Sequence, residues 1–94
     1  MQVAWDENKN RTNQKKHHVS FEVARYVFDD PLHVSRQDRI EGGELRWQTI
    51  GQVGSMALLL VAHTVTEADG SVTIRIISAR KADKTERRIY EQGA

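Results

Sequence analysis

The amino-acid sequence predicts one α+β domain over residues 1–94, built from an antiparallel sheet of about four to five strands, two N-terminal helices and one C-terminal helix. Three observations support this fold class. Helix-capping residues and polar helical segments fill the first third of the chain. Alternating and apolar segments separated by short glycine turns follow, which is the pattern of an antiparallel meander. A capped basic segment closes the chain, and 94 residues supply one core of modest size.

The N-terminal region predicts a short strand followed by a helix. Val3 and Trp5 stand two residues apart, as on one face of a strand over residues 2–5. Asp6 has the chemistry of an N-cap, and the helix that it begins runs to about Lys16. This segment is almost wholly polar, so periodicity gives the helix little support.

A second helix is predicted after Ser20, which is a good N-cap. Ala24 and Phe28 then follow one helical face. Because Pro31 disfavours helical conformation in the residue before it, this helix should end near Phe28 or Asp29.

The middle of the chain predicts the sheet. Residues 33–43 are polar and end in two glycines, so they form either a short edge strand or a mobile loop. Residues 44–53 alternate as a half-buried strand would. Residues 56–65 are apolar on both faces, which places this strand at the centre of the sheet. A turn over residues 67–71 then leads into a β-branched strand over residues 72–80.

The last segment predicts a basic helix. Asp83 can cap it, and Glu86 three residues later can complete a capping box, so the helix should span about residues 83–92. Residues 75–91 hold six Lys or Arg and three Asp or Glu, whereas the whole chain carries a net charge of only +1. Such segregated positive charge suggests a polyanionic partner.

The composition limits the classes of function. Cysteine is absent, so neither a disulfide framework nor a thiolate zinc site is available. The longest apolar run, residues 56–62, is far shorter than the roughly 20 residues of a membrane helix. Asp6 and Glu7 stand where a signal peptide would need an apolar stretch. We therefore expect a cytoplasmic protein with no membrane partner, no metal and no cofactor.

Lys, His and Arg side chains supply the chemistry that cleaves RNA without a metal. That reaction needs a base for the 2′-hydroxyl, an acid for the leaving 5′-oxygen and cations for the phosphate. Imidazole can do either proton transfer, and guanidinium matches phosphate oxygens. The candidate catalytic residues are Lys16, His17, Arg46, His63 and Arg80, and the candidate substrate-binding residues are Lys15, Arg75, Arg87 and Arg88.

Several candidates have a purely structural alternative. Lys15 and Lys16 can simply solvate a polar helix end, and His17 can cap the C-terminus of the first helix. His63 shares a strand face with valines and can be a hydrogen-bonded core histidine. Arg46 can line a solvated sheet surface.

The C-terminal arginines differ among themselves. Arg80 lies at a strand end next to a helix N-terminus, a place where anion sites commonly form. Arg87 and Arg88 point about 100° apart on a helix, so at least one is expected to be solvated or to meet an acidic partner. His17 and Arg80 are poor candidates for core packing, so their alanine variants are expected to keep the fold.

With these residues in view, the chain resembles the BrnT family of type II toxins, small ribonucleases of the RelE/ParE-like superfamily. The stretches that carry the resemblance occur in the family's order: WDENKNRTNQKKH, VSFEVARYVFDDP, ELRWQTIG, LLVAHT and IRIISARKADKTERRIYE. They leave out residues 32–43 and 67–71. Two positions depart from the family pattern: His18 replaces a usual Gly after the Lys-His pair, and Val23 replaces a Glu.

The resemblance implies a fold, an activity and a partner. It implies helices packed on one side of the sheet and a basic groove where RNA is cut to arrest translation. It also implies a BrnA-like ribbon-helix-helix antitoxin that covers the toxin, joins two toxin–antitoxin pairs into a 2:2 heterotetramer and contacts operator DNA. The family motif positions present here are Lys16, His17, Arg46, His63, Arg75 and Arg80.

Three functional hypotheses follow from the sequence. The first is a metal-independent endoribonuclease toxin. The second is a non-catalytic nucleic-acid-binding regulator that uses the same basic surface. The third is a protein-interaction module whose basic helix meets an acidic partner.

Overall fold

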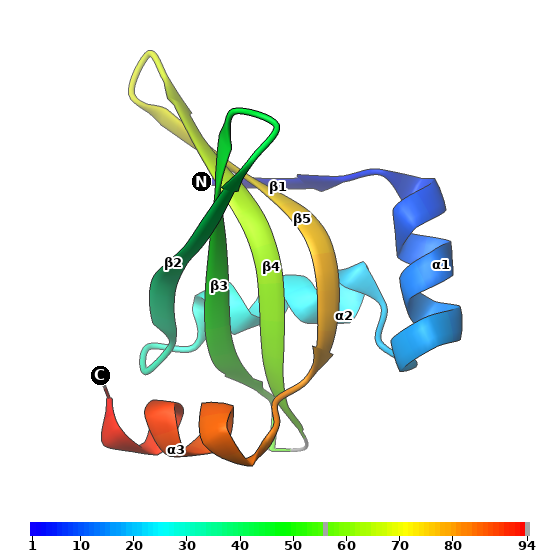
Figure 1. Cartoon of the computed structure of the whole chain (residues 1–94), viewed down its shortest axis with the longest axis vertical. Coiled ribbons are helices and arrows are strands. Elements are labelled where there is room, and N and C mark those ends of the chain that lie inside the picture. The colour runs from blue at the N-terminus through cyan, green and yellow to red at the C-terminus, as the bar shows by residue number, and fades with distance from the viewer. Residues whose placement is uncertain (56, 94) are drawn as a thin grey trace.

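The computed structural model describes residues 1–55 and 57–93, which form a five-stranded sheet with helices on both of its faces (Figure 1). The strands are ordered β1-β5-β4-β3-β2 across the sheet. In chain order the elements are β1 (Gln2–Trp5), α1 (Glu7–His17), α2 (Phe21–Ala24), the 3₁₀ helix η1 (Arg25–Asp29), β2 (Val34–Glu41), β3 (Glu44–Val53), β4 (Ala57–Ala68), β5 (Ser71–Lys81) and α3 (Lys84–Gln92).

The antiparallel meander of β2, β3, β4 and β5 is confirmed. Strand β4 is central, as its apolar residues on both faces predict. It continues to Ala68, three residues past the predicted end, and Met56, its predicted start, lies outside the described residues. Residues 33–43, for which the sequence predicted either a short edge strand or a mobile loop, contain an edge strand, β2, of 8 residues.

The sheet is mixed, whereas the sequence predicted an antiparallel sheet. Strand β1 pairs in parallel with β5, with Val3 opposite Ile74 and Trp5 opposite Ile76. Parallel partners require a long connection. Here the two helices and the rest of the sheet lie between β1 and β5 in the chain. The pairing closes one edge of the strand that carries Arg75 and Arg80.

Helix α1 forms where capping predicted it, although its composition is polar. The Asp6 carboxylate accepts hydrogen bonds from the backbone N–H groups of Asn8 and Lys9. At the other end His18 adopts a left-handed conformation with φ of 60°, a position that glycine normally fills. The helix therefore begins and ends by local chemistry.

Two buried asparagines attach α1 to the domain in place of an apolar stripe. The Asn13 amide donates to the carbonyls of Val19 and Ala79, at 2.8 and 2.9 Å, and accepts from the Ala79 N–H. Asn10 donates to Glu22 and accepts from the Phe21 N–H. These bonds satisfy buried polar groups and hold α1 against β5 and the start of α2.

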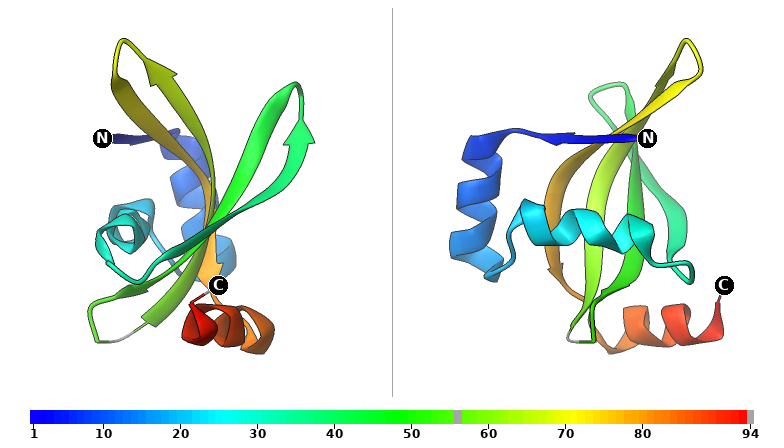
Figure 2. Two further views of the ribbon diagram at one scale, coloured as in Figure 1. Left: turned by 90° about the vertical axis from the view of Figure 1, so that its left-hand side faces the viewer. Right: turned by 180° about the vertical axis from the view of Figure 1, so that it is seen from behind.

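The helices pack on opposite faces of the sheet, whereas the family resemblance implied one side (Figure 2). Alternation along β4 explains this. Leu59 and Val61 pack with Phe21 of α2 and with Val27 of η1. The intervening Leu58 and Leu60 face the other way and form a second cluster with Ile50, against which Ile89 and Tyr90 of α3 pack. The sheet thus has one face under α2 and η1, and one face that α3 covers at one end.

Candidate functional site

The sheet face on the α3 side gathers arginines from three strands; Figure 1 looks onto this face. Residues directly opposite each other in neighbouring strands share a face. Arg36 of β2 is opposite Gln48, Arg75 of β5 is opposite Thr64, and Arg80 is opposite Leu60. Arg46 lies two residues before Gln48 on β3 and shares its face. We call the surface formed by Arg36, Arg46, Arg75 and Arg80 the basic face.

Two of these arginines are paired with carboxylates of the β2–β3 hairpin. An Arg46 guanidinium nitrogen lies 3.7 Å from both the Glu41 and the Glu44 carboxylates, and one of Arg75 lies 3.2 Å from Glu44. The Arg46 Nε is the buried side-chain polar atom without a hydrogen-bond partner in the described chain. Arg46 and Arg75 are therefore partly neutralised, and Arg46 keeps an unused donor.

Arg36 is a member of the basic face that the sequence interpretation missed. Its Nε and Nη2 donate to the Gln48 side-chain oxygen at 3.2 and 3.1 Å. Within residues 1–55 and 57–93, no carboxylate lies within 4.0 Å of it. Its guanidinium is thus positioned by a neutral partner, and its charge acts on the Glu86 carboxylate only from beyond ion-pair distance, so it can still bind an anion. Had residues 33–43 been taken as a strand, pairing with β3 would have placed Arg36 beside Gln48.

Arg80 is held by a carboxylate of α3. Its two terminal nitrogens donate to the two oxygens of Glu86, each at 2.8 Å. Glu86 is buried and also accepts from the Asp83 N–H, which completes the predicted capping box. The bidentate pair lowers the pKa of Glu86 despite its burial, and the charge of Arg36 contributes to the same shift. Arg80 therefore anchors α3 while 37% of its side chain stays exposed.

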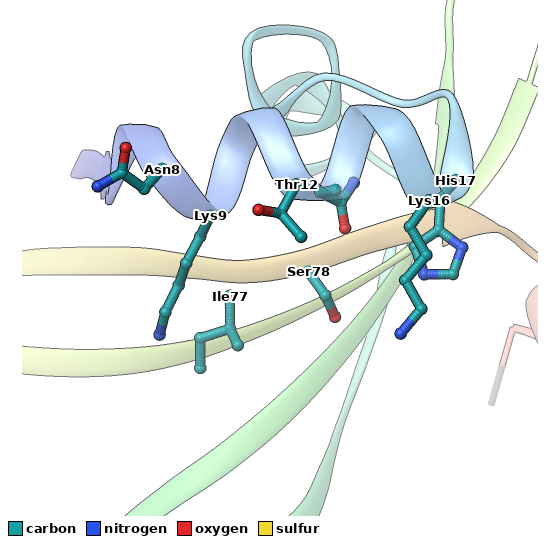
Figure 3. Close-up of a pocket in the computed structure, with 8 residues that line it drawn as sticks. Asn8, Lys9, Thr12, Lys16, His17, Ile77 and Ser78 are labelled. Carbon is teal, nitrogen blue, oxygen red and sulfur yellow. The ribbon is translucent and has the colours of Figure 1, made fainter.

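A pocket of about 380 Å³ opens between α1 and β5 (Figure 3). Lys16 and His17, from the last turn of α1, lie at one end of it. Ser78 of β5 lies on its floor, opposite Ala62, which is itself opposite Gln48. Gln48 is in turn opposite Arg36, so Ser78 and Arg36 lie on the same face of the sheet, at the two ends of one row of opposed residues. Lys16 and His17 therefore lie at the edge of the basic face that is next to β5. Its lining residues are Asn8, Lys9, Thr12, Asn13, Lys16, His17, Ile77 and Ser78.

His63 lies on the opposite face of the sheet, away from the basic face. It is 2% exposed, and its ring packs edge-on against Phe28 with a centroid distance of 5.0 Å. Its Nε2 lies 2.6 Å from the Thr49 hydroxyl, and burial lowers its pKa to about 4. This environment favours the structural alternative, a hydrogen-bonded core histidine.

Three further sequence candidates lie apart from the pocket. Lys15 is exposed and does not line it. Arg87 is exposed beside the start of α3, near Lys81, and Arg88 is exposed on the same helix. The structure therefore does not bring these three cations into the pocket that Lys16 and His17 line.

The arrangement is suited to binding a polyanion and to moving protons next to it. Guanidinium and ammonium groups bind phosphate, and an imidazole beside them can exchange a proton near neutral pH. In the part of the chain that the structure describes, no three His, Asp or Glu side chains are grouped so that they could hold a metal ion. None of the described helices is long and apolar enough to cross a membrane.

Comparison with known proteins identifies the family of this chain. The 1.1 Å crystal structure of the Brucella abortus ribonuclease toxin BrnT is similar, with a TM-score of 0.62 and 21% sequence identity. The match covers 89% of this chain and 99% of that one, which shows a shared α+β fold. The comparison with curated proteins found no match. A family model described as the ribonuclease toxin BrnT of a type II toxin–antitoxin system matches residues 5–86. Since this range is most of the chain, the protein belongs to the BrnT family of ribonuclease toxins.

Proposed function

We propose that this protein is a metal-independent endoribonuclease that cuts RNA in the cytoplasm and thereby arrests translation and growth. One observation carries the proposal: the Lys16–His17 end of α1 lies beside β5 at one edge of the basic face, and on the same face Arg36 of β2 has no carboxylate partner among the described residues. A proton-transfer group and phosphate-binding cations thus lie on one continuous surface, along which a single-stranded RNA could run.

The proposed reaction is attack of the 2′-oxygen of RNA on the adjacent phosphorus. A base takes the 2′-hydroxyl proton, the bond from phosphorus to the 5′-oxygen breaks, and an acid protonates that oxygen. The products are a 2′,3′-cyclic phosphate and a 5′-hydroxyl end. His17 and Lys16 supply the proton transfers. Arg36, with Arg46 and Arg75, stabilises the negative charge on the phosphate oxygens.

Arg80 has a positioning role in this proposal. Its bidentate pair with Glu86 fixes the start of α3 at the border of the basic face. The exposed part of the guanidinium adds positive potential there. His63 is left out of the proposed site because it is buried on the other face.

The proposed partner is a BrnA-like ribbon-helix-helix antitoxin that covers the basic face. Membership of a type II toxin–antitoxin family supports an antitoxin partner and an RNA substrate. The finer parts of the proposal are the BrnA type, a 2:2 assembly joined through the antitoxin, and contact with operator DNA only through the antitoxin.

The test is to incubate the purified protein with single-stranded RNA in excess EDTA and to analyse the ends of the products. We expect cleavage that leaves cyclic phosphate and 5′-hydroxyl ends. His17→Ala should lower the rate by about 10²–10³, a typical loss for one transition-state group. The exposed His18→Asn is the matched control next to it, because asparagine tolerates the left-handed backbone of this position, and it should cut at the wild-type rate. Cleavage that requires a divalent ion would contradict the mechanism.

A second candidate function is a nucleic-acid-binding regulator without catalysis. The observation that favours it is that His17 is the single histidine in the pocket lining, because His63 is buried elsewhere. Salt-dependent RNA or DNA binding without cleavage by the chain alone would establish this alternative.

A further inference from the structure

We propose that the pocket between α1 and β5 holds one nucleotide of the RNA next to the cut bond and sets the base preference. Thr12 and Ser78 would read the base, Lys9 would hold the phosphate on one side of it, and Lys16 would lie at the phosphate that is cut on the other side. This inference rests on the proposed ribonuclease function and adds a specificity site to it.

The size and form of the pocket suit a single nucleotide. Its volume of about 380 Å³ is at the lower end of the range of about 300–1,000 Å³ that is usual for small-ligand sites. Figure 3 shows the side chains of Lys9, Thr12 and Lys16 leaving the same side of α1 toward β5, with Ile77 and Ser78 beneath them. A planar base entering there has an apolar wall in Ile77.

Two hydroxyl groups in the pocket lining are available for hydrogen bonds to a ligand. The hydroxyls of Thr12 and Ser78 make no hydrogen bond to any residue in the two described segments. Both stand in the pocket lining, one on each side of the opening between helix and strand. A hydroxyl can both donate and accept, so the pair can read an edge of a base whose unpaired polar groups face them.

Two lysines stand at opposite ends of the pocket. Lys9 and Lys16 are seven residues apart on α1, which is two turns or roughly 10 Å along the helix axis. Figure 3 shows them on either side of Thr12 and Ser78. No Asp or Glu lines the pocket, so nothing in its lining neutralises them. A nucleotide seated between them meets one cation toward each neighbouring phosphate.

The pocket is also held rigid. The buried Asn13 amide bonds both the Val19 carbonyl and the backbone of Ala79, one residue after Ser78. These bonds fix the distance between α1 and β5, and with it the width of the pocket. A preorganised site of this kind discriminates better than a loop that must order on binding.

The first test measures base preference. Four RNAs that differ only in the nucleotide next to the cut bond are compared for cleavage by wild type, Thr12→Val and Ser78→Ala. We expect each variant to change the ratio of rates between bases roughly fivefold to tenfold, since each loses one hydrogen bond to the base. Thr85→Val, the same change at an exposed site on α3, should leave the ratios unchanged. Wild-type ratios in both pocket variants would overturn the inference.

The second test does not need cleavage. Binding of a 2′-deoxy-substituted RNA, which lacks the attacking hydroxyl, is followed by fluorescence anisotropy at several salt concentrations. Lys9→Gln should weaken binding and lower the salt slope by about one phosphate contact. Arg11→Gln removes the same charge from the other side of α1 and should do neither. Equal effects from the two variants would overturn the pocket assignment. A chain that binds in this way but never cuts RNA would overturn the ribonuclease proposal alone.

Discussion

At the scale of single residues, His63 shows how one buried polar group is accommodated. Its imidazole Nε2 is hydrogen-bonded to the Thr49 hydroxyl at 2.6 Å, and this hydroxyl in turn lies 2.7 Å from that of Ser35. The other ring nitrogen faces the Thr64 carbonyl at 3.4 Å. The neutral ring is therefore satisfied, whereas a charged ring would be buried without a counter-ion.

The pH dependence of stability follows from this environment. Burial lowers the pKa of His63 from 6.5 to about 4, so the unfolded chain binds the proton more readily than the folded one. The stabilisation is complete above pH 6.5, is lost as the pH falls toward 4, and amounts to about 3 kcal/mol. Urea unfolding of wild type and His63→Gln across this range measures it. The variant should lose less stability on acidification, and parallel curves would contradict the assignment.

Arg80 combines a structural and an electrostatic role, and this changes the expectation for its alanine variant. Poor suitability for core packing suggested an intact fold, but removal of Arg80 leaves the buried Glu86 carboxylate without its bidentate partner. Breaking fully buried pairs costs about 3–5 kcal/mol. Because Arg80 is more than a third exposed and screened by water, we expect about 1–2 kcal/mol.

The measurement for Arg80→Ala is thermal or urea unfolding beside the Arg80→Ala, Glu86→Gln double variant. The double variant should recover part of the lost stability, because the buried group is then neutral. A fully stable Arg80→Ala protein would show that the pair contributes nothing to folding.

At the scale of elements, local chemistry made the helices predictable. Asp6, Ser20 and Asp83 each cap the helix that the sequence predicted from them. The second helix ends as 3₁₀ at Asp29, within the predicted limits before Pro31. Capping involves neighbours in the chain, so the sequence contains the whole interaction.

Long-range packing was less predictable. The parallel pairing of β1 with β5 joins residues about 70 positions apart, and nothing in four residues of β1 specifies its direction. Ile89 and Tyr90 of α3 pack against Leu58 and Leu60 of β4. Because β4 is apolar on both faces, its sequence does not indicate on which face α3 packs. These contacts were therefore missed.

Tyr90 ties α3 to the rest of the domain. Its hydroxyl donates to Asp30 at 2.6 Å, and this bond raises the pKa of Tyr90 to about 12. The same Asp30 carboxylate accepts from the backbone N–H groups of Gln52 and Leu32. Burial alone would raise the pKa of Asp30, but these three bonds outweigh burial and lower it.

Tyr90→Phe should therefore loosen α3 without moving the sheet. Loss of a hydrogen bond to a charged acceptor at this partly buried site should cost about 1–2 kcal/mol. Hydrogen exchange should become faster in α3 while β4 keeps its protection. Tyr26→Phe, at an exposed tyrosine of η1, is the matched control. Unchanged exchange in α3 would show that Asp30 does not hold this helix.

At the scale of the whole molecule, the two faces of the sheet differ in composition: one is mainly apolar and the other carries the arginines. The face under α2 and η1 holds the larger apolar core. The other face carries the basic face, with the α1 pocket at its edge and α3 at one end. The net charge of only +1 conceals this division, since acidic residues of the hairpin and of α3 balance the arginines.

The candidate site was predictable only in part. The residue types pointed to Lys16, His17 and the arginines of β3 and β5, because cations and imidazoles are visible in a sequence. Arg36 was missed because its strand lacks an apolar pattern, and His63 was included because burial is not visible in residue type. Which side chains share a face depends on strand register, and only the structure supplies it.

The basic face is also the surface that we expect the antitoxin to cover. An acidic or amphipathic segment laid over the basic face would exclude RNA and relieve repulsion among the arginines. We expect Arg36→Glu to weaken the complex, measured as a higher dissociation constant, and Arg25→Glu on η1 to leave it unchanged. A complex that cuts RNA as fast as the free chain would contradict inhibition by covering.

In the proposed function, RNA binds and is cut on the basic face and at its α1 pocket. The most direct measurement is a ¹H–¹⁵N NMR titration of the whole chain with a 2′-deoxy-substituted RNA that cannot be cleaved. We expect shifts concentrated at Lys16, His17, Arg36 and Ser78, with α2 and η1 unaffected. Shifts concentrated on α2 and η1, or no shifts at RNA concentrations that saturate cleavage, would contradict it.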